Sequence, residues 1–236
     1  MSCYCYENHR NTPQKLGIVK RYFSKIELNS EAKILDVGGI SSYYEILKAI
    51  FPRGKIFLLN NNSEDVKGVN NSIAGDAIQL PFKKETFDVI TSFDLIEHLI
   101  NPDDFLAESS RILKWRGWFV ISTPNLADFY SRLTFLFGYT PFSYNPSKFR
   151  VATPFSKLET NMGHKSVFTY KGLKQLLLLH GFEVIKSEGY CYCDLNADME
   201  KRKREAGFYR FRERVNKLLP NSMREGMLFI SMKVRK

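Results

Sequence analysis

The sequence is poor in cysteine and histidine, with four of each among its 236 residues. The cysteines form two C-x-C pairs, Cys3/Cys5 and Cys191/Cys193. This spacing does not suit a disulfide within a pair, and it lacks the usual zinc-ligand pattern. We therefore expect reduced thiols, no metal and a cytoplasmic protein. A metal site built from all four thiolates is the alternative.

Long apolar runs and flexible linkers are missing as well. No stretch of 18 apolar residues is free of charge, which predicts that no helix spans a membrane. The first residues have no basic region followed by an apolar region, so we expect no secretory leader. No repeat or Gly/Ser-rich segment divides the chain, which predicts a single domain over residues 1–236.

The composition is that of a globular protein, with 44% hydrophobic and 25% charged residues. These values exclude a collagen-like, coiled-coil or disordered chain. The net charge of +10 is unevenly distributed, because residues 1–120 are neutral and residues 121–236 carry 20 basic against 10 acidic side chains. The second half therefore predicts an anionic partner, whether nucleic acid, a membrane surface or an acidic substrate.

Apolar runs alternate with helical patterns along the chain. Helices are expected from Pro13, from a cap at Ser41 or Ser42, and from Pro102 and Tyr170. Strands are expected at residues 33–37, 55–59, 73–76, 87–93, 117–122, 182–185 and 227–232. This alternation predicts a doubly wound α/β fold with a mainly parallel sheet. Such a fold binds its ligand at the carboxyl ends of the strands.

The first strand is followed by a glycine turn, Asp36-Val37-Gly38-Gly39. Glycine allows the backbone to approach a ligand and exposes amide groups at a helix start. Asp36 ends an otherwise apolar strand, where a carboxylate is costly without a partner. It either meets a cationic ligand or backbone amides, or it caps its own turn.

Several segments in order resemble the class I S-adenosylmethionine-dependent methyltransferases, in particular their type-11-like branch. The segments are Ile34–Gly39, Gly75–Phe82, Phe87–Leu99, Pro102–Phe105, Gly117–Asn125 and Gly181–Val184. The resemblance covers roughly residues 30–190. It implies S-adenosylmethionine as cofactor and a seven-stranded Rossmann-like sheet whose last strand is antiparallel.

The resemblance also implies positions for the cofactor-binding residues. Asp36, Gly38 and Gly39 would line its methionine part, Asp76 and Ala77 would meet the adenine, and Phe93 at the end of the fourth strand would flank the transfer site. Asn60 stands where the family usually has an acidic residue that binds the ribose hydroxyls. An amide loses a charge-assisted pair there, so Asn60→Asp is expected to tighten binding.

Two histidines lie where a base could act on the acceptor. His98 follows the fourth strand, at the ligand-binding end of the sheet, and His164 precedes the helix from Tyr170. A base is needed if the methyl group goes to oxygen. The alternative is structural: His98 would hold its loop and His164 would make a contact at a helix start.

Three further segments stand outside the common pattern. Residues 1–28 are expected to form an N-terminal helical extension. Residues 126–166 are an insertion with helical spacing, which in the resembling family forms the acceptor side. The alternative is a helix packed on the core, and both interpretations can hold. Residues 198–220 predict a basic amphipathic helix that contacts an anionic membrane or phosphates; the alternative is a solvated surface helix that packs on the protein through its apolar stripe.

From this pattern we expect transfer of a methyl group from S-adenosylmethionine, by direct in-line displacement, to a small-molecule or lipid- or sugar-linked acceptor. The acceptor is expected to be anionic, because the basic excess lies in the half that carries both insertions. An RNA methyltransferase that uses this basic half is one alternative. The other is a degenerate protein that keeps the fold and binds without turnover.

Overall fold

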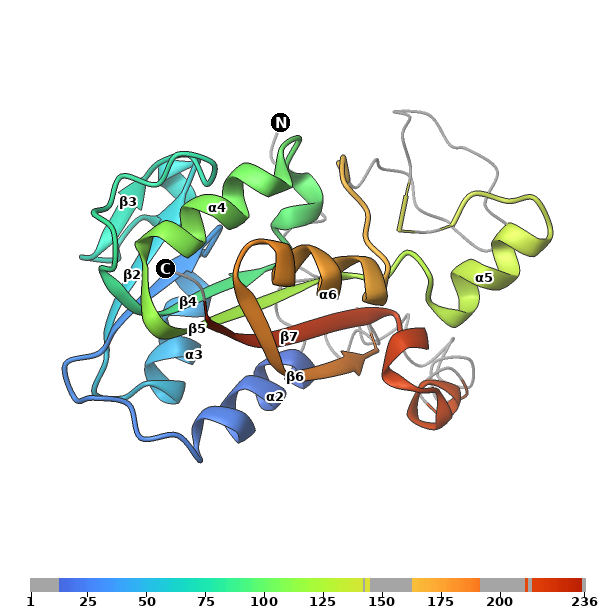
Figure 1. The fold of residues 1–236 in the computed structure, drawn as a ribbon, viewed down its shortest axis with the longest axis horizontal. Coiled ribbons are helices and arrows are strands. Elements are labelled where there is room, and N and C mark those ends of the chain that lie inside the picture. Colours follow the sequence, from blue (N-terminus) through green and yellow to red (C-terminus); the bar gives the residue numbers. More distant parts are fainter. Residues whose placement is uncertain (1–12, 142, 145–162, 192–210, 212–213, 235–236) are drawn as a thin grey trace.

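The computed structural model describes residues 13–141, 143–144, 163–191, 211 and 214–234, with a seven-stranded sheet at its centre (Figure 1). The strands lie in the order β3-β2-β1-β4-β5-β7-β6. Their bounds are β1 Lys33–Val37, β2 Lys55–Asn60, β3 Ser72–Ala74, β4 Phe87–Phe93, β5 Leu113–Pro124, β6 Phe182–Tyr190 and β7 Gly226–Lys233. Strand β7 runs antiparallel to β5 and β6, and the pairs from β3 to β5 are parallel. The predicted fold is confirmed, including the antiparallel last strand.

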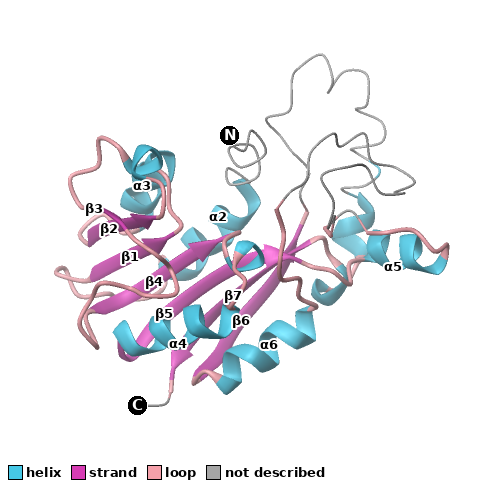
Figure 2. Ribbon diagram, turned by 90° about the horizontal axis from the view of Figure 1, so that it is seen from above, coloured by secondary structure: helices cyan, strands magenta, loops and turns pink. Residues whose placement is uncertain are grey.

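Helices cover both faces of the sheet (Figure 2). The α-helices are α2 Pro13–Phe23, α3 Ser41–Ile50, α4 Pro102–Ile112, α5 Phe129–Leu136 and α6 Tyr170–Leu179, and short 3-10 helices are η1 Ser63–Val66, η2 Ile96–His98 and η3 Asn221–Met223. One buried apolar cluster joins the sheet to α4 and α6, and a second joins it to α2 and α3. Within the described ranges, no helix is long and apolar enough to cross a bilayer.

The direction of the chain across the sheet reverses between β1 and β4. From β1 the chain continues to β2 and β3 on one side, and from β4 it continues to β5 on the other. Residue Asp36 of β1 is in register with Thr91 of β4. In doubly wound folds the crevice at such a reversal, outside the carboxyl ends of the strands, is the place where ligands bind.

Strands β5 and β6 extend several residues beyond their predicted ranges, because pairing with distant strands lengthens them. Strand β6 continues through Lys186 and Glu188 to Tyr190, and these polar residues resemble a loop in the sequence. Along this stretch β6 pairs with β7, with Glu188 opposite Leu228 and Tyr190 opposite Gly226. Backbone hydrogen bonds to a strand far along the chain therefore outweigh the local preference.

The start of α3 differs from the prediction. The residue at the N-cap is Ile40, and it makes no side-chain cap hydrogen bond. The hydroxyl of Ser41 donates instead to the carbonyl oxygens of Asp65 and Lys67, at 3.0 and 3.1 Å. The predicted serine cap is thus wrong, because the Ser41 hydroxyl bonds to the segment after β2.

The expectation of reduced thiols is wrong for Cys191. This buried residue follows β6 and is disulfide-bonded. The other three cysteines lie outside the described residues. Spacing along the chain does not determine which segments meet in space, so the C-x-C pattern could not reveal this bond.

Helix α5 confirms the helical spacing predicted within residues 126–166, and Asp128 caps it. The Asp128 carboxylate accepts hydrogen bonds from the amides of Tyr130 and Ser131, at 2.9 and 3.2 Å, and from the Ser131 hydroxyl. Burial is the main reason that the pKa of Asp128 is raised from 3.8 to about 6, and the nearby charge of Glu225 adds to it.

The raised pKa of Asp128 predicts a pH-dependent effect of Asp128→Asn, which keeps an acceptor oxygen at the cap and removes the titrating group. The folded protein holds this proton up to about pH 6, whereas the unfolded chain releases it near 3.8. The contribution of Asp128 to stability therefore falls as pH rises through this window, by at most about 1.4 kcal/mol per unit. Relative to wild type, the variant should gain stability from pH 4 to 6 in urea unfolding.

The exposed Asp104→Asn on α4 is the control for this measurement, because it also removes one negative charge. The difference in the free energy of unfolding between Asp104→Asn and wild type should stay nearly constant from pH 4 to 6. A constant difference for Asp128→Asn would contradict the prediction.

Candidate functional site

The glycine turn after β1 requires glycine at both positions. Gly38 has a φ of +76°, in the left-handed region, and its amide donates to the carbonyl oxygen of Leu59 at 2.7 Å. A Cβ atom on Gly39 would lie 2.3 Å from Oδ2 of Asp36. The turn therefore brings the carboxyl ends of β1 and β2 against the start of α3.

Asp36 lies on β1 just before this turn and faces β4, the neighbouring strand at the point where the chain direction reverses. Its side chain is buried, with 1% of the residue exposed, and Oδ1 accepts a 2.7 Å hydrogen bond from the hydroxyl of Thr91 on β4. This hydroxyl is neither of the expected partners, which were a cationic ligand or backbone amides, so binding of a cationic ligand by Asp36 stays a prediction. This partner belongs to β4, so Asp36 does more than cap its own turn.

The turn fits the amino-acid part of S-adenosylmethionine, which carries a carboxylate and an ammonium group. Among the residues that the structure describes, the amides of Gly39 and Ile40 donate to no protein acceptor. They lie at the N-terminus of α3, where amides and the helix dipole favour an anion such as a carboxylate. The Asp36 carboxylate, beside the same turn, has the charge to hold an ammonium group.

Asn60 stabilises the turn from the end of β2. Its Nδ2 donates to the carbonyl oxygen of Gly39 at 2.9 Å, and its Oδ1 accepts from the amide of Asn62 at 3.0 Å. The donor and the acceptor atom of the Asn60 side-chain amide thus both form hydrogen bonds within the protein. The ribose-binding role of Asn60 stays a prediction, and its described role is to join β2 to the glycine turn.

Asp76 and Ala77 follow β3, next to Asn60. The amide of Gly75 donates to the carbonyl oxygen of Asn60 at 3.0 Å, which places this loop beside the end of β2. Asp76 is exposed and accepts from the amide of Ile78 at 3.1 Å, whereas Ala77 is buried in the apolar core. The loop thus holds Asp76 at the surface beside the turn, where a role at the adenine stays a prediction.

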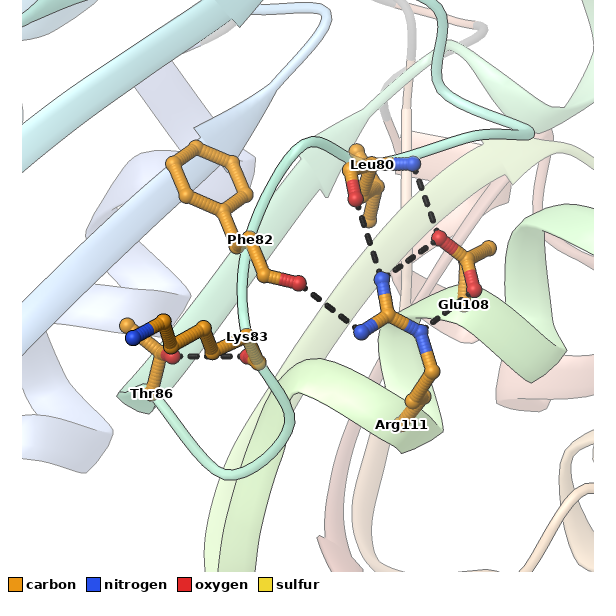
Figure 3. Close-up of polar contacts among 6 residues, drawn as sticks. All are labelled: Leu80, Phe82, Lys83, Thr86, Glu108 and Arg111. Atoms are coloured by element: carbon orange, nitrogen blue, oxygen red, sulfur yellow. Dashed lines mark hydrogen bonds and ion pairs between the residues drawn. The ribbon is translucent and has the colours of Figure 1, made fainter.

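An arginine on α4 holds the continuation of this loop in place (Figure 3). The guanidinium group of Arg111 donates to the carbonyl oxygens of Leu80 and Phe82, at 3.0 and 2.8 Å. Glu108 accepts from the amide of Leu80 at 2.8 Å and pairs with Arg111 at 2.6 Å. This pairing lowers the pKa of Glu108 and keeps the carboxylate ionised.

Phe93 is the last residue of β4, and its contacts point to α2 and α3. Its ring stacks on that of Tyr43 with centroids 5.6 Å apart, and the ammonium group of Lys15 lies 5.6 Å from the ring. The described contacts do not join Phe93 to the glycine turn. Its predicted place beside the cofactor stays a prediction.

A buried ion pair that the sequence did not reveal lies next to Phe93. Lys15 of α2 is fully buried and pairs with Asp94, 79 residues away. Asp94 also accepts from the hydroxyl of Ser122 at 3.0 Å and of Tyr190 at 3.3 Å. The signal in the sequence resembles that for Asp36: an acidic residue at or directly after the end of a buried strand.

Glu97 of η2 lies deeper in the same region. Its residue is 2% exposed, and Oε2 accepts a 2.8 Å hydrogen bond from the hydroxyl of Thr123 on β5. Burial, with a contribution from the charge of Asp94, raises the pKa of Glu97 to about 8. A carboxyl group with such a perturbed pKa, at the ligand-binding end of the sheet, is typical of functional sites.

The two predicted catalytic histidines come together beside Glu97. The rings of His98 and His164 meet edge to face, with centroids 5.0 Å apart. Nδ1 of His98 lies 3.3 Å from the carbonyl oxygen of Gly163, and Nδ1 of His164 lies 2.6 Å from that of Ser143. His98 thus holds its loop, as the structural alternative has it, whereas the hydrogen bond of His164 goes to the carbonyl oxygen of Ser143, which does not lie at the start of α6. One nitrogen or oxygen atom from each of Glu97, His98 and His164 lies within 4.8 Å of the others, which is close enough to hold a metal ion.

Comparison with known proteins relates residues 8–187 to a family described as the methyltransferase domain. A probable S-adenosylmethionine-dependent methyltransferase of Mycolicibacterium smegmatis is 31% identical over 120 residues, which is 48% of this chain and 44% of that protein. The chain thus spans under half the length of that relative.

Two solved structures share the fold. An S-adenosylmethionine-dependent methyltransferase of Archaeoglobus fulgidus has a TM-score of 0.62 and 19% identity, over 99% of this chain and all of that one. Phosphoethanolamine N-methyltransferase 2 of Haemonchus contortus, in complex with S-adenosyl-L-methionine, has a TM-score of 0.59 and 14% identity, over 94% of this chain and 53% of that one.

The hydrogen bond from Asn60 to Gly39 reverses the expectation for Asn60→Asp. A carboxylate cannot donate to the Gly39 carbonyl oxygen and would face it at about the same distance. We expect a loss of about 1–3 kcal/mol in the free energy of unfolding and weaker cofactor binding, because the turn is destabilised. Urea unfolding and calorimetric titration with S-adenosylmethionine measure the two effects.

Asn62→Asp is the matched control, because Asn62 uses its side-chain oxygen to accept from the amide of Glu64 and an aspartate can do the same. Asn62→Asp should leave the free energy of unfolding and the affinity for S-adenosylmethionine nearly unchanged. Tighter cofactor binding by Asn60→Asp would contradict the prediction and would support the ribose assignment.

Proposed function

Since the chain belongs to the family of S-adenosylmethionine-dependent methyltransferase domains, we propose that it methylates an oxygen atom of an anionic acceptor, either a small molecule or a molecule linked to a lipid or sugar. The observation that carries this proposal is the meeting of His98 and His164 beside buried Glu97. A hydroxyl group must lose its proton when it accepts a methyl group, and imidazole takes up protons near neutral pH.

The cofactor supplies a methyl group activated by a positively charged sulfur atom; its transfer breaks the carbon–sulfur bond and leaves the electron pair on sulfur. The protein has to orient the reactants and exclude water. Asp36 and the turn amides hold the amino-acid part of the cofactor, and the buried pair of Lys15 and Asp94 closes the carboxyl end of β4.

The histidines have a defined tautomer at this site. A carbonyl oxygen can only accept a hydrogen bond, so Nδ1 of His98 and of His164 carries the proton that binds Gly163 or Ser143. In a neutral ring the lone pair is then on Nε2. We propose that Nε2 of one of these rings receives the proton of the acceptor hydroxyl while the oxygen attacks the methyl carbon.

Charge and exposed apolar surface support an anionic, lipid-linked acceptor. Lys165 is exposed directly beside His164, in the half of the chain that carries the excess of positive charge. Helix α5 and the residue after it expose Leu136 and Phe137, at 76% and 72%, an apolar surface suited to a lipid environment.

The predicted amphipathic helix at 198–220 supports peripheral contact with an anionic membrane. Most of this segment lies outside the described residues. In the described part, residues 214–218 are helical, and Leu218, exposed at 87%, lies on the surface with Arg214 and Lys217. Basic and apolar side chains exposed together are typical of helices that bind anionic lipid surfaces.

Asp36→Asn tests the cofactor site. The variant keeps an oxygen that accepts from Thr91 and loses the charge that faces the ammonium group of the cofactor. We expect at least about a tenfold loss of affinity for S-adenosylmethionine in calorimetric titration, because a charge-assisted hydrogen bond is lost. Asp88→Asn, at the opposite end of β4, is the control and should bind normally. Equal affinity of Asp36→Asn and wild type would show that the site is elsewhere.

Transfer of labelled methyl groups tests the acceptor. The full chain is incubated with methyl-labelled S-adenosylmethionine and, separately, with a polar lipid extract, a mixture of sugar phosphates and nucleotide sugars, and total RNA. We expect label in the lipid or phosphorylated-sugar fraction. His98→Ala and His164→Ala each remove one candidate base, and at least one of them should lower the rate by about 100-fold or more, with little change in cofactor affinity.

The control for this assay is His180→Ala, which changes a histidine at the end of α6 that pairs with Asp103. It should retain the wild-type rate. Label found only in RNA would overturn the proposed acceptor in favour of the RNA alternative. Cofactor binding without transfer to any of the three fractions would instead support the non-catalytic alternative.

A further inference from the structure

We propose that Glu97, His98 and His164 form a binding site for one divalent transition-metal ion of the zinc type. One ligand atom from each side chain lies within 4.8 Å of the other two. The role of the ion at the acceptor rests on the proposed function, whereas its binding does not.

The ligand set selects the class of metal. Two imidazole nitrogens and one carboxylate oxygen suit zinc and related transition metals, whereas magnesium and calcium prefer oxygen ligands alone. With three protein ligands, zinc keeps an open fourth position for water or substrate. The set is thus that of a catalytic site rather than of a closed structural one.

The separations are compatible with an ion after small adjustments. Ligand atoms about 2.1 Å from a tetrahedral ion lie roughly 3.4 Å apart. Separations of up to 4.8 Å therefore require shifts on the order of 1 Å, which side-chain torsions can supply.

The backbone holds the ligands together although they come from distant segments. The carbonyl oxygen of Glu97 accepts from the amides of Lys165 and Ser166, at 2.7 and 3.0 Å. The hydroxyl of Ser166 donates to the carbonyl oxygen of Leu99 at 2.8 Å. These bonds join the segment that follows His164 to η2, so the three side chains meet without relying on a metal.

Each of the three proposed ligand side chains is oriented by a hydrogen bond to a neighbouring group of the protein. Nδ1 of each imidazole bonds to a backbone carbonyl oxygen, which puts the lone pair of the neutral ring on Nε2. The Glu97 carboxylate accepts from the hydroxyl of Thr123 at 2.8 Å. Metal-binding histidines and carboxylates are oriented by such partners, which set the tautomer and the ring position.

An ion at this site would activate the acceptor directly. The acceptor hydroxyl would occupy the open position, and the ion would lower its pKa so that its proton passes to water. The resulting oxygen anion attacks the methyl carbon, and the carbon–sulfur electron pair stays on sulfur. With the ion bound, the imidazoles would serve as its ligands; the proton transfer to Nε2 proposed above applies to the chain without the ion.

Metal binding is measured on the full chain without cofactor or acceptor. After removal of metals with EDTA, the chain is titrated with Co²⁺, followed by its visible absorption, and then with Zn²⁺ as competitor. Elemental analysis counts the bound zinc. We expect one zinc per chain, and a loss of affinity of about 100-fold or more in His164→Ala and Glu97→Gln, since each removes a ligand atom. His180→Ala is the control and should bind like wild type.

Two further measurements separate loss of a ligand from loss of structure. Thr123→Val keeps all three ligands, so it should still bind one zinc, with about tenfold lower affinity. Zinc should raise the melting temperature of wild type and His180→Ala but not of His164→Ala, because a ligand stabilises only a folded state that binds it.

The absence of stoichiometric binding in wild type would overturn the proposal. Full zinc retention by the combined His98→Ala and His164→Ala variant would overturn it as well, since the metal would then be held elsewhere, for example by cysteines. A chain that binds zinc through these residues but methylates no acceptor would support the metal site and overturn the proposed function.

Discussion

Burial of the sheet on both faces is the constraint on which the site depends. Strands β1, β4 and β5 are packed against helices on either side, so their central positions are apolar. Polar side chains can be accommodated only where these strands end. The parallel direction of the strands then gathers those ends at one edge, where Asp36, Asp94 and Glu97 all lie. The concentration of buried acidic groups at this edge follows from the topology.

Buried acidic groups at that edge are costly, and each has a partner in the structure. Asp36 accepts from Thr91, Asp94 pairs with Lys15, and Glu97 accepts from Thr123. A buried ion pair contributes little to stability compared with apolar residues of similar size, because both charges lose their hydration. The presence of three buried acidic groups at this edge is therefore better explained by ligand binding than by a contribution to stability.

Local features of the site could be predicted from the sequence, whereas the hydrogen-bond partner of each polar side chain could not. The sequence showed that Gly38 and Gly39 form a turn and that Asn60 ends the second strand. It did not show that the Asn60 amide donates to Gly39, and this one bond reverses the expected effect of an aspartate at position 60. The predicted cap at Ser41 fails for a similar reason, since its hydroxyl bonds to the segment after β2. Hydrogen-bond partners depend on which groups lie within about 3 Å, and periodicity carries no such information.

The sequence by itself determined the alternation of strands and helices, the glycine turn with its aspartate, and the two histidines near the ligand-binding end. These features depend on hydrophobic periodicity and on backbone preferences, which act over a few residues. Only the tertiary structure decided that His98 meets His164, that Lys15 reaches Asp94 across 79 residues, and that Cys191 is disulfide-bonded. Such contacts join segments far apart in the chain, and they form because packing of the whole domain makes up for the entropy lost in bringing those segments together.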